Sequence, residues 1–137
     1  MENIEEAYEY LSRYALSFVE NRCWDEIYCK FQIYSTMVTA EQYYIFNLEK
    51  NNKGGFSIDS SAMWDGLDAA SYIRDNILEN TGDRIWGLIF TLYPSGKFTI
   101  EYDYNIPEDY EESDKTISGE EINKSLMELN NKINGKI

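Results

Sequence analysis

The chain has 137 residues, of which 43% are hydrophobic and 15% aromatic, and it carries a formal net charge of −13 at pH 7. This length predicts one domain spanning residues 1–137, and the apolar and aromatic content excludes a disordered chain. The charge disfavours binding to nucleic acid or to an anionic membrane, because both would repel it. It favours encounter with a basic protein, although a merely solvated acidic surface is the alternative reading.

The first half of the chain predicts a helix followed by two strands. Apolar residues recur at helical spacing over residues 3–21. Residues 24–34 and 40–48 alternate between apolar and polar side chains, as half-buried strands do, and residues 56–58 can form a short extra strand. On the first strand the residues expected to face the core are Ile27, Cys29, Phe31 and Ile33.

The second half predicts a helix, a hairpin and a final helix. Asp59, Ser60 and Ser61 can cap a helix over residues 62–79. Residues 85–104 form two alternating strands joined by Pro94-Ser95-Gly96, in which the glycine takes the left-handed position after a type I turn. Ser118 and Glu121 match a capping box that opens a helix running to about residue 134.

Together these elements predict an α+β fold. It is an antiparallel sheet of two hairpins, with four to five strands and helices packed on one face. The order along the chain is helix, two strands, an optional short strand, helix, two strands and helix. Tyr28 and Tyr34 would then lie on the uncovered face of the sheet. The three tryptophans, Trp24, Trp64 and Trp86, are expected to pack at the edges of the core.

The residues that most enzymes need are missing from the sequence. There is no histidine, so neither a Ser–His nor a Cys–His nucleophile can be built. The two cysteines, Cys23 and Cys29, match no zinc pattern and are expected to be buried free thiols. We therefore predict a protein that is not an enzyme and has no metal or cofactor. An enzyme or metal protein that uses carboxylates alone remains an alternative.

The N-terminus has no basic region followed by an apolar stretch, as a signal peptide would. No segment approaches the roughly 20 apolar residues that span a bilayer. These two features predict a cytoplasmic protein.

The segment from Glu101 to Asp114 contains seven acids and no base, with tyrosines among the acids. Tyrosine gives a rigid contact area with a polar tip, and interfaces favour it. Acids interleaved with tyrosines suit a surface that meets lysine and arginine, whereas a loop that merely keeps the protein soluble is the alternative. The candidate partner-binding residues are Glu101, Asp103, Tyr104, Glu108, Asp109, Tyr110, Glu111 and Glu112.

The hairpin at residues 86–104, with the sequence WGLIFTLYPSGKFTIEYDY, resembles the hallmark hairpin of the YezG-like immunity (antitoxin) proteins. The matching features are a strand led by tryptophan, a Gly-Lys-Phe turn, and a return strand ending in Tyr-Asp-Tyr. Residues 24–28, WDEIY, also resemble the opening of that family's first hairpin. The resemblance extends in order over residues 1–104 and is specific in 86–104.

The resemblance implies a bacterial antitoxin encoded beside a polymorphic toxin, often one with a nuclease domain. Such a protein would bind the toxin domain and cover its basic active site or substrate groove. An acidic adaptor or regulatory protein-binding domain with no toxin partner is the alternative function. Rescue of cells from an adjacent toxin would separate the two.

Overall fold

The computed structural model describes residues 1–107, and the predictions that fall on residues 108–137, including the final helix, lie outside the described residues. The chain divides into two units, Met1–Asn105 and Ile106–Ile137. The fold described below is that of the first unit.

Two helices form as predicted. Helix α1 covers Ile4–Val19 and begins at Asn3, whose side-chain oxygen accepts a hydrogen bond from the backbone N–H of Glu6 at 2.8 Å. Helix α2 covers Ser60–Thr81 and ends at Gly82, which has a φ of 79° and donates its N–H to the carbonyl of Leu78.

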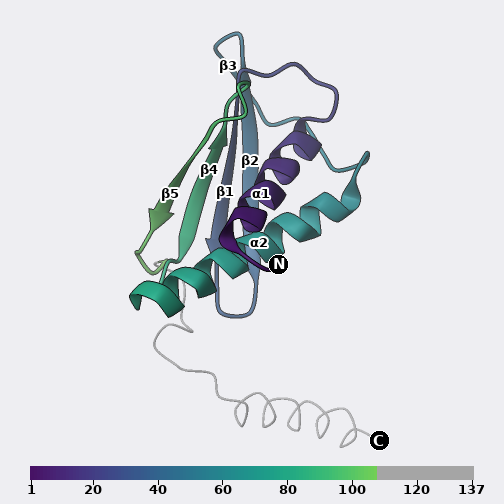
Figure 1. Ribbon diagram of the computed structural model, residues 1–137. Coiled ribbons are helices and arrows are strands. Elements are labelled where there is room, and N and C mark those ends of the chain that lie inside the picture. The colour runs from purple at the N-terminus through teal and green to yellow at the C-terminus, as the bar shows by residue number, and fades with distance from the viewer. Residues whose placement is uncertain (108–137) are drawn as a thin grey trace, which may run out of the picture. The chain divides into compact units, whose positions relative to one another are not determined.

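Five strands make one antiparallel sheet in the order β3-β2-β1-β4-β5. Both helices lie against the same face of this sheet (Figure 1). The predicted α+β class is therefore confirmed. The strands are β1 Glu26–Ile33, β2 Val38–Phe46, β3 Glu49–Asn51, β4 Gly87–Leu92 and β5 Phe98–Asp103.

The core lies between the sheet and the helices, and β1 runs through its centre with β2 on one side and β4 on the other. The inward residues of β1 are fully buried, as the alternating pattern predicts. Opposite them, α1 buries one stripe at helical spacing. The largest buried side chains include Tyr14, Phe31, Phe90, Leu11, Ile27 and Ile73.

Gly66 allows the two helices to approach each other closely. A Cβ at this position would lie 2.3 Å from Cδ2 and 2.7 Å from Cγ of the buried Tyr14 ring. We expect Gly66→Ala to destabilise the protein by about 2 kcal/mol, because the clash outweighs the better helix propensity of alanine. Urea unfolding measures this loss. Gly82→Ala is not a suitable control because its φ is positive, whereas Ser71→Ala changes the same helix without this clash.

Tyr14 also predicts how stability changes at high pH. Burial raises the pKa of Tyr14 above its ordinary value of 10.0. Above pH 10 the unfolded chain loses this proton first, so the stability contributed by the neutral phenol is present below pH 10 and falls as pH rises. We expect the free energy of unfolding of Tyr14→Phe to fall less steeply between pH 10 and 11 than that of wild type, by about 1 kcal/mol per pH unit. Parallel curves in urea titrations would contradict this.

The hairpin of β4 and β5 closes through the predicted turn. Gly96 has a φ of 88° and donates its N–H to the carbonyl of Tyr93 at 2.9 Å. Tyr93 in turn donates its N–H to the carbonyl of Lys97 at 2.9 Å. This is a type I turn followed by a left-handed glycine, as the sequence indicates.

The short extra strand lies elsewhere than predicted. It is β3, at Glu49–Asn51, and residues 56–58 form no strand. Strand β2 ends at Phe46, and the next two residues, Asn47 and Leu48, have φ values of 51° and 67°. Two successive positive φ values are typical of a two-residue hairpin loop, in which the sequence is usually Asn-Gly or Asp-Gly. Because Asn47 is followed by Leu48 and not by glycine, the sequence does not indicate a turn at this position.

Two predictions of burial were wrong. Trp64 is 63% exposed, because it lies on the side of α2 away from the buried Ala62, Gly66 and Ala69. Cys23 is exposed in the connection between α1 and β1, whereas Cys29 is fully buried as predicted. Burial raises the pKa of the Cys29 thiol well above its usual range, so it stays protonated.

Candidate protein-binding surface

The second face of the sheet carries the candidate surface. Neither α1 nor α2 covers it, and its side chains follow from the strand register. We call it the open face. Its residues are Tyr28, Lys30 and Gln32 of β1, Thr39, Glu41, Tyr43 and Ile45 of β2, Lys50 of β3, Ile89 and Thr91 of β4, and Thr99, Glu101 and Asp103 of β5.

A stacked pair of tyrosines lies on this face. Tyr28 and Tyr43 are directly opposite each other in the register of β1 and β2, with ring centroids 4.9 Å apart and an interplanar angle of 20°. The ammonium group of Lys50 lies 4.3 Å from the centroid of the Tyr43 ring. These contacts hold both rings in place before any partner arrives, which lowers the entropy cost of binding.

The hydroxyl of Tyr28 donates a hydrogen bond to the carboxylate of Glu26. This bond, together with partial burial, raises the pKa of Tyr28 to about 12. The phenol is therefore neutral at every physiological pH. The pair presents apolar rings with a polar edge, which is the combination that protein interfaces favour.

Two shallow depressions lie on the open face. One, of 340 Å³, is lined by the two tyrosines together with residues that include Lys30, Glu41 and Ile89. A second, of 200 Å³, lies between β1 and β5 and is lined by residues that include Gln32, Glu101 and Asp103. The open face is thus hollowed on either side of Lys30 and Ile89, where side chains of a partner can enter.

The structure places three of the predicted site residues. Glu101 and Asp103 are exposed on the open face of β5, and Tyr104 follows them with 54% exposure. Asp103 accepts hydrogen bonds from the backbone N–H and the side-chain amide of Asn105, at 2.9 and 3.1 Å. These bonds fix the end of the strand. The other predicted residues, Glu108, Asp109, Tyr110, Glu111 and Glu112, lie outside the described residues.

Sequence patterns missed part of this surface. They placed Tyr28 on the uncovered face, but Tyr43 and Lys50 join it only through the pairing of β2 with β1 and β3. The missing signal was the register of the first hairpin. Placing β2 from Val38, with a turn closed by the N–H of Tyr34 and the carbonyl of Met37, would have brought the two tyrosines together.

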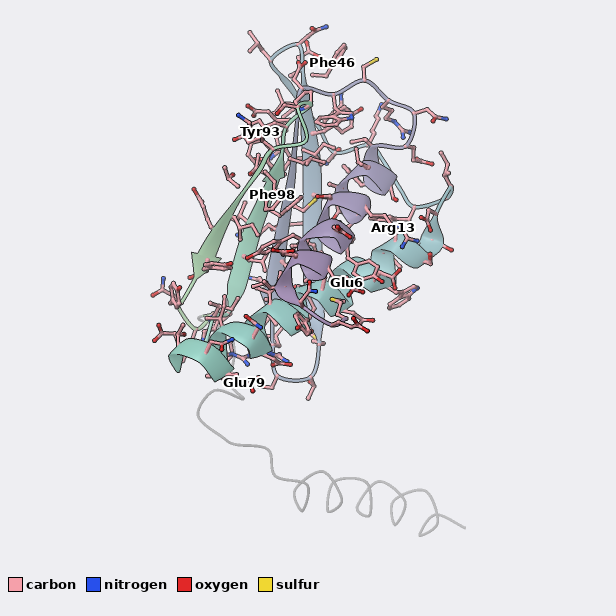
Figure 2. The ribbon with its side chains drawn as sticks, viewed as in Figure 1. Glu6, Arg13, Phe46, Glu79, Tyr93 and Phe98 are labelled. Carbon is pink, nitrogen blue, oxygen red and sulfur yellow. The ribbon has the colours of Figure 1, made fainter. Side chains whose placement is uncertain are left out.

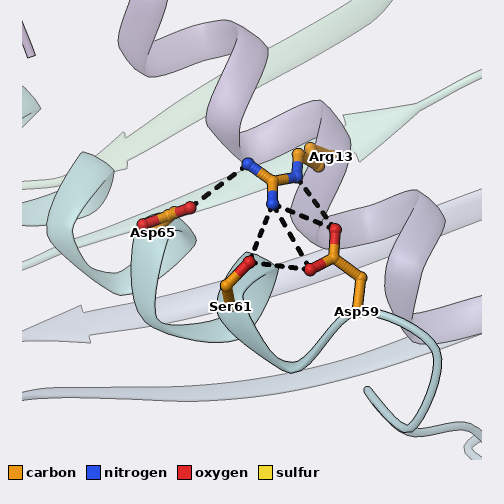
Figure 3. A network of polar contacts seen from close by, with 4 residues as sticks. All are labelled: Arg13, Asp59, Ser61 and Asp65. Carbon is orange, nitrogen blue, oxygen red and sulfur yellow. Dashed lines mark hydrogen bonds and ion pairs between the residues drawn. The ribbon is translucent and has the colours of Figure 1, made fainter.

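The opposite side of the molecule carries a network of ion pairs around Arg13 (Figure 3). Its guanidinium contacts Asp59 at 3.0 Å and Asp65 at 3.2 Å, and it donates to the hydroxyl of Ser61 at 2.9 Å. Hydrogen bonds from Ser61 and Arg13 hold the pKa of Asp59 below its usual value. Asp59 occupies the N-cap position of α2, but its side chain makes no cap hydrogen bond. The network therefore ties α1 to the start of α2.

Acidic side chains are not confined to the predicted segment. Glu2 precedes α1, and the first turns of the helix carry Glu5, Glu6 and Glu9; Figure 2 shows Glu6 on the helix layer. The open face is mixed: Lys30, Glu41 and Lys50 lie on β1, β2 and β3, and the acids Glu101 and Asp103 lie on β5. Within the described residues, β5 is the strand that contributes two acids and no base to this face.

Two further findings concern residues 1–107. No cluster of three or more histidine, cysteine, aspartate or glutamate side chains among them could hold a metal ion. Neither of their helices combines the length and the apolar character that a membrane crossing requires.

No protein-family model matches the chain, and no curated protein is similar to it in sequence. The resemblance of the hairpin at residues 86–104 to the YezG-like immunity proteins therefore stays a prediction.

Proposed function

We propose that the protein is a bacterial immunity protein that acts in the cytoplasm by binding a cognate toxin domain. It covers the basic active site or substrate groove of that domain, for which a nuclease is the expected kind. The observation that supports this best is the open face, where the stacked tyrosines of β1 and β2 share one side of the sheet with the acids of β5. Aromatic anchors that share a face with acids suit a partner surface rich in lysine and arginine.

In this proposal the two parts of the face have different roles. The acids Glu101 and Asp103, with the predicted acids at residues 108–112, steer the basic partner to the face. Tyr28 and Tyr43 provide the lasting affinity, because desolvated anchors contribute more than charges at the rim of an interface. The protein acts as a binding partner and performs no catalysis of its own.

The test uses the toxin-like protein with a basic C-terminal domain that the adjacent gene would encode. Co-expression with wild type should rescue cells from that domain, and the double variant Tyr28→Ala/Tyr43→Ala should weaken the complex by about 100-fold or more. Calorimetry on the purified proteins measures the affinity. Both tyrosines are only partly buried, so we expect the variant to fold. Circular dichroism checks this.

The matched control is Trp64→Ala, which removes an exposed aromatic ring from the helix layer. It should leave binding unchanged. If Trp64→Ala abolishes binding while the tyrosine variant binds normally, the helix layer is the interface and the open face is not. If the protein binds a partner but never rescues cells from a toxin, the alternative of an acidic adaptor is favoured.

A further inference from the structure

The edge strand β5 has features that point to a second partner. It pairs with β4 on one side, and within the described residues no strand pairs with its other side (Figure 1). The opposite edge of the sheet is the three-residue strand β3. Strand β5 is twice as long and contains neither proline nor lysine, the residues that commonly protect such edges.

The hydrogen bonds of the hairpin show which backbone groups of β5 point outward. The carbonyl of Lys97 accepts from Tyr93, and the carbonyl of Asp103 accepts from Trp86 at 2.7 Å. In an antiparallel pair, residues alternate between bonding inward and bonding outward. The N–H and C=O groups of Phe98, Ile100 and Tyr102 therefore point to the free edge.

The apolar side of β5 is also incompletely covered. Phe98 contacts Tyr8 of α1 and Phe90 of β4, with ring centroids 5.3 and 5.2 Å apart, yet it remains 38% exposed. Figure 2 shows Phe98 at this rim, beside α1. Tyr104, just past the strand, is 54% exposed. A strand added at this edge would cover the rim of the core as well as the backbone groups.

We propose that two copies of the chain pair antiparallel through β5, with the two-fold axis at Ile100, and form one continuous ten-stranded sheet. In this register Ile100 faces the partner's Ile100, and Phe98 faces the partner's Tyr102. It is the one antiparallel register in which all three outward-pointing residues find partners. A two-fold interface requires such self-complementarity.

The charges of the hairpin fit a second copy better than an unrelated strand. Lys97 is the one basic residue between positions 85 and 107. The proposed register places it directly opposite the partner's Asp103 and diagonal to the partner's Glu101. Two such pairs form by symmetry. One like-charge contact remains, the diagonal between Glu101 and the partner's Glu101, about 7–8 Å apart.

This arrangement does not depend on the proposed toxin, because it concerns the isolated chain. It would place two open faces side by side, with the acids of β5 at the junction between them. Sedimentation equilibrium of the purified chain, which has a monomer mass of 16.1 kDa, should show a reversible dimer. A chain that stays monomeric up to the highest soluble concentration would overturn the proposal.

Charge reversal tests the register. Lys97→Glu or Asp103→Lys alone should raise the dimer dissociation constant by about tenfold, because two attractive pairs become repulsive. The double variant Lys97→Glu/Asp103→Lys should restore most of the affinity, because both direct pairs form again with their charges exchanged. A dimer that none of these variants affects forms through another surface, and that result would refute pairing through β5.

A backbone variant tests the strand pairing itself. Proline at position 100 removes an N–H that points outward, so the bonds to β4 are retained. Ile100→Pro should abolish the dimer, and Ile100→Ala, which loses the side chain but keeps the N–H, should retain most of it. If wild type is monomeric and Ile100→Pro, unlike Ile100→Ala, instead weakens a complex with another protein, β5 accepts that protein's strand and the pairing of copies is wrong.

Discussion

Replacing Phe31 with alanine should reduce the free energy of unfolding by about 3–5 kcal/mol. Phe31 is fully buried on β1, the central strand of the sheet, and its ring lies 5.1 Å from that of Tyr14 on α1. Its removal leaves a cavity between the sheet and the helix. A backbone that pairs on both sides, with β2 and with β4, has little freedom to close that cavity.

Urea unfolding followed by circular dichroism measures this loss. The matched control is Phe46→Ala at the end of β2, which makes the same chemical change at a side chain that is 37% exposed. The control should cost about 1–2 kcal/mol, because more than a third of this residue is already exposed to water. Equal losses for the two variants would show that the core does not centre on β1.

Much of the fold follows from the periodicity of the sequence. The alternation around Ile27, Cys29, Phe31 and Ile33 predicted both a strand and its buried face, because a central strand with one covered face imposes period two. The hairpin at residues 85–104 was equally readable, since Pro94-Ser95-Gly96 supplies the turn that its geometry needs. These segments carry local signals that agree with the tertiary structure.

Other features depend on contacts between distant segments. Asn47 and Leu48 adopt positive φ values without glycine, and the N–H of Asn47 donates to the carboxylate of Asp25 at 2.9 Å. Asp25 lies just before β1, 22 residues before Asn47, so the sequence around the turn does not include this partner. Trp64 was expected to cover the edge of the core because it lies near the start of its helix. The space against the core is instead filled by small residues such as Gly66, which let α1 approach.

Only one part of the candidate site, the acids of β5, could be predicted from the sequence. The acids of β5 were visible because they are consecutive outward positions of one strand. The stack of Tyr28 on Tyr43 joins positions from two strands, and a shift of one residue in register would have sent Tyr43 to the core. A sequence pattern predicts faces of single elements, whereas a surface of several strands also needs the register between them.

The acids of β5 predict the rate at which a basic partner binds. Replacing Glu101 and Asp103 with glutamine and asparagine, together with the four acids at residues 108–112, should lower the association rate constant at low salt by about tenfold or more. Dissociation should change little, because exposed charges at a rim act mainly on encounter. Stopped-flow association with the basic toxin domain, at low and at moderate salt, measures both the rate and its salt dependence.

A pair of two-charge variants separates local steering from net charge. Glu101→Gln/Asp103→Asn and Asp68→Asn/Glu79→Gln each remove two exposed acids, the first pair from the open face and the second from α2. Both leave the same net charge, so a long-range effect of total charge would slow association equally. We expect the β5 variant to associate more slowly and to have the weaker salt dependence. At 0.1 M salt, charges more than about 10 Å apart are largely screened, so the charges close to the contact dominate. Equal rates for the two variants would show that β5 does not steer the partner.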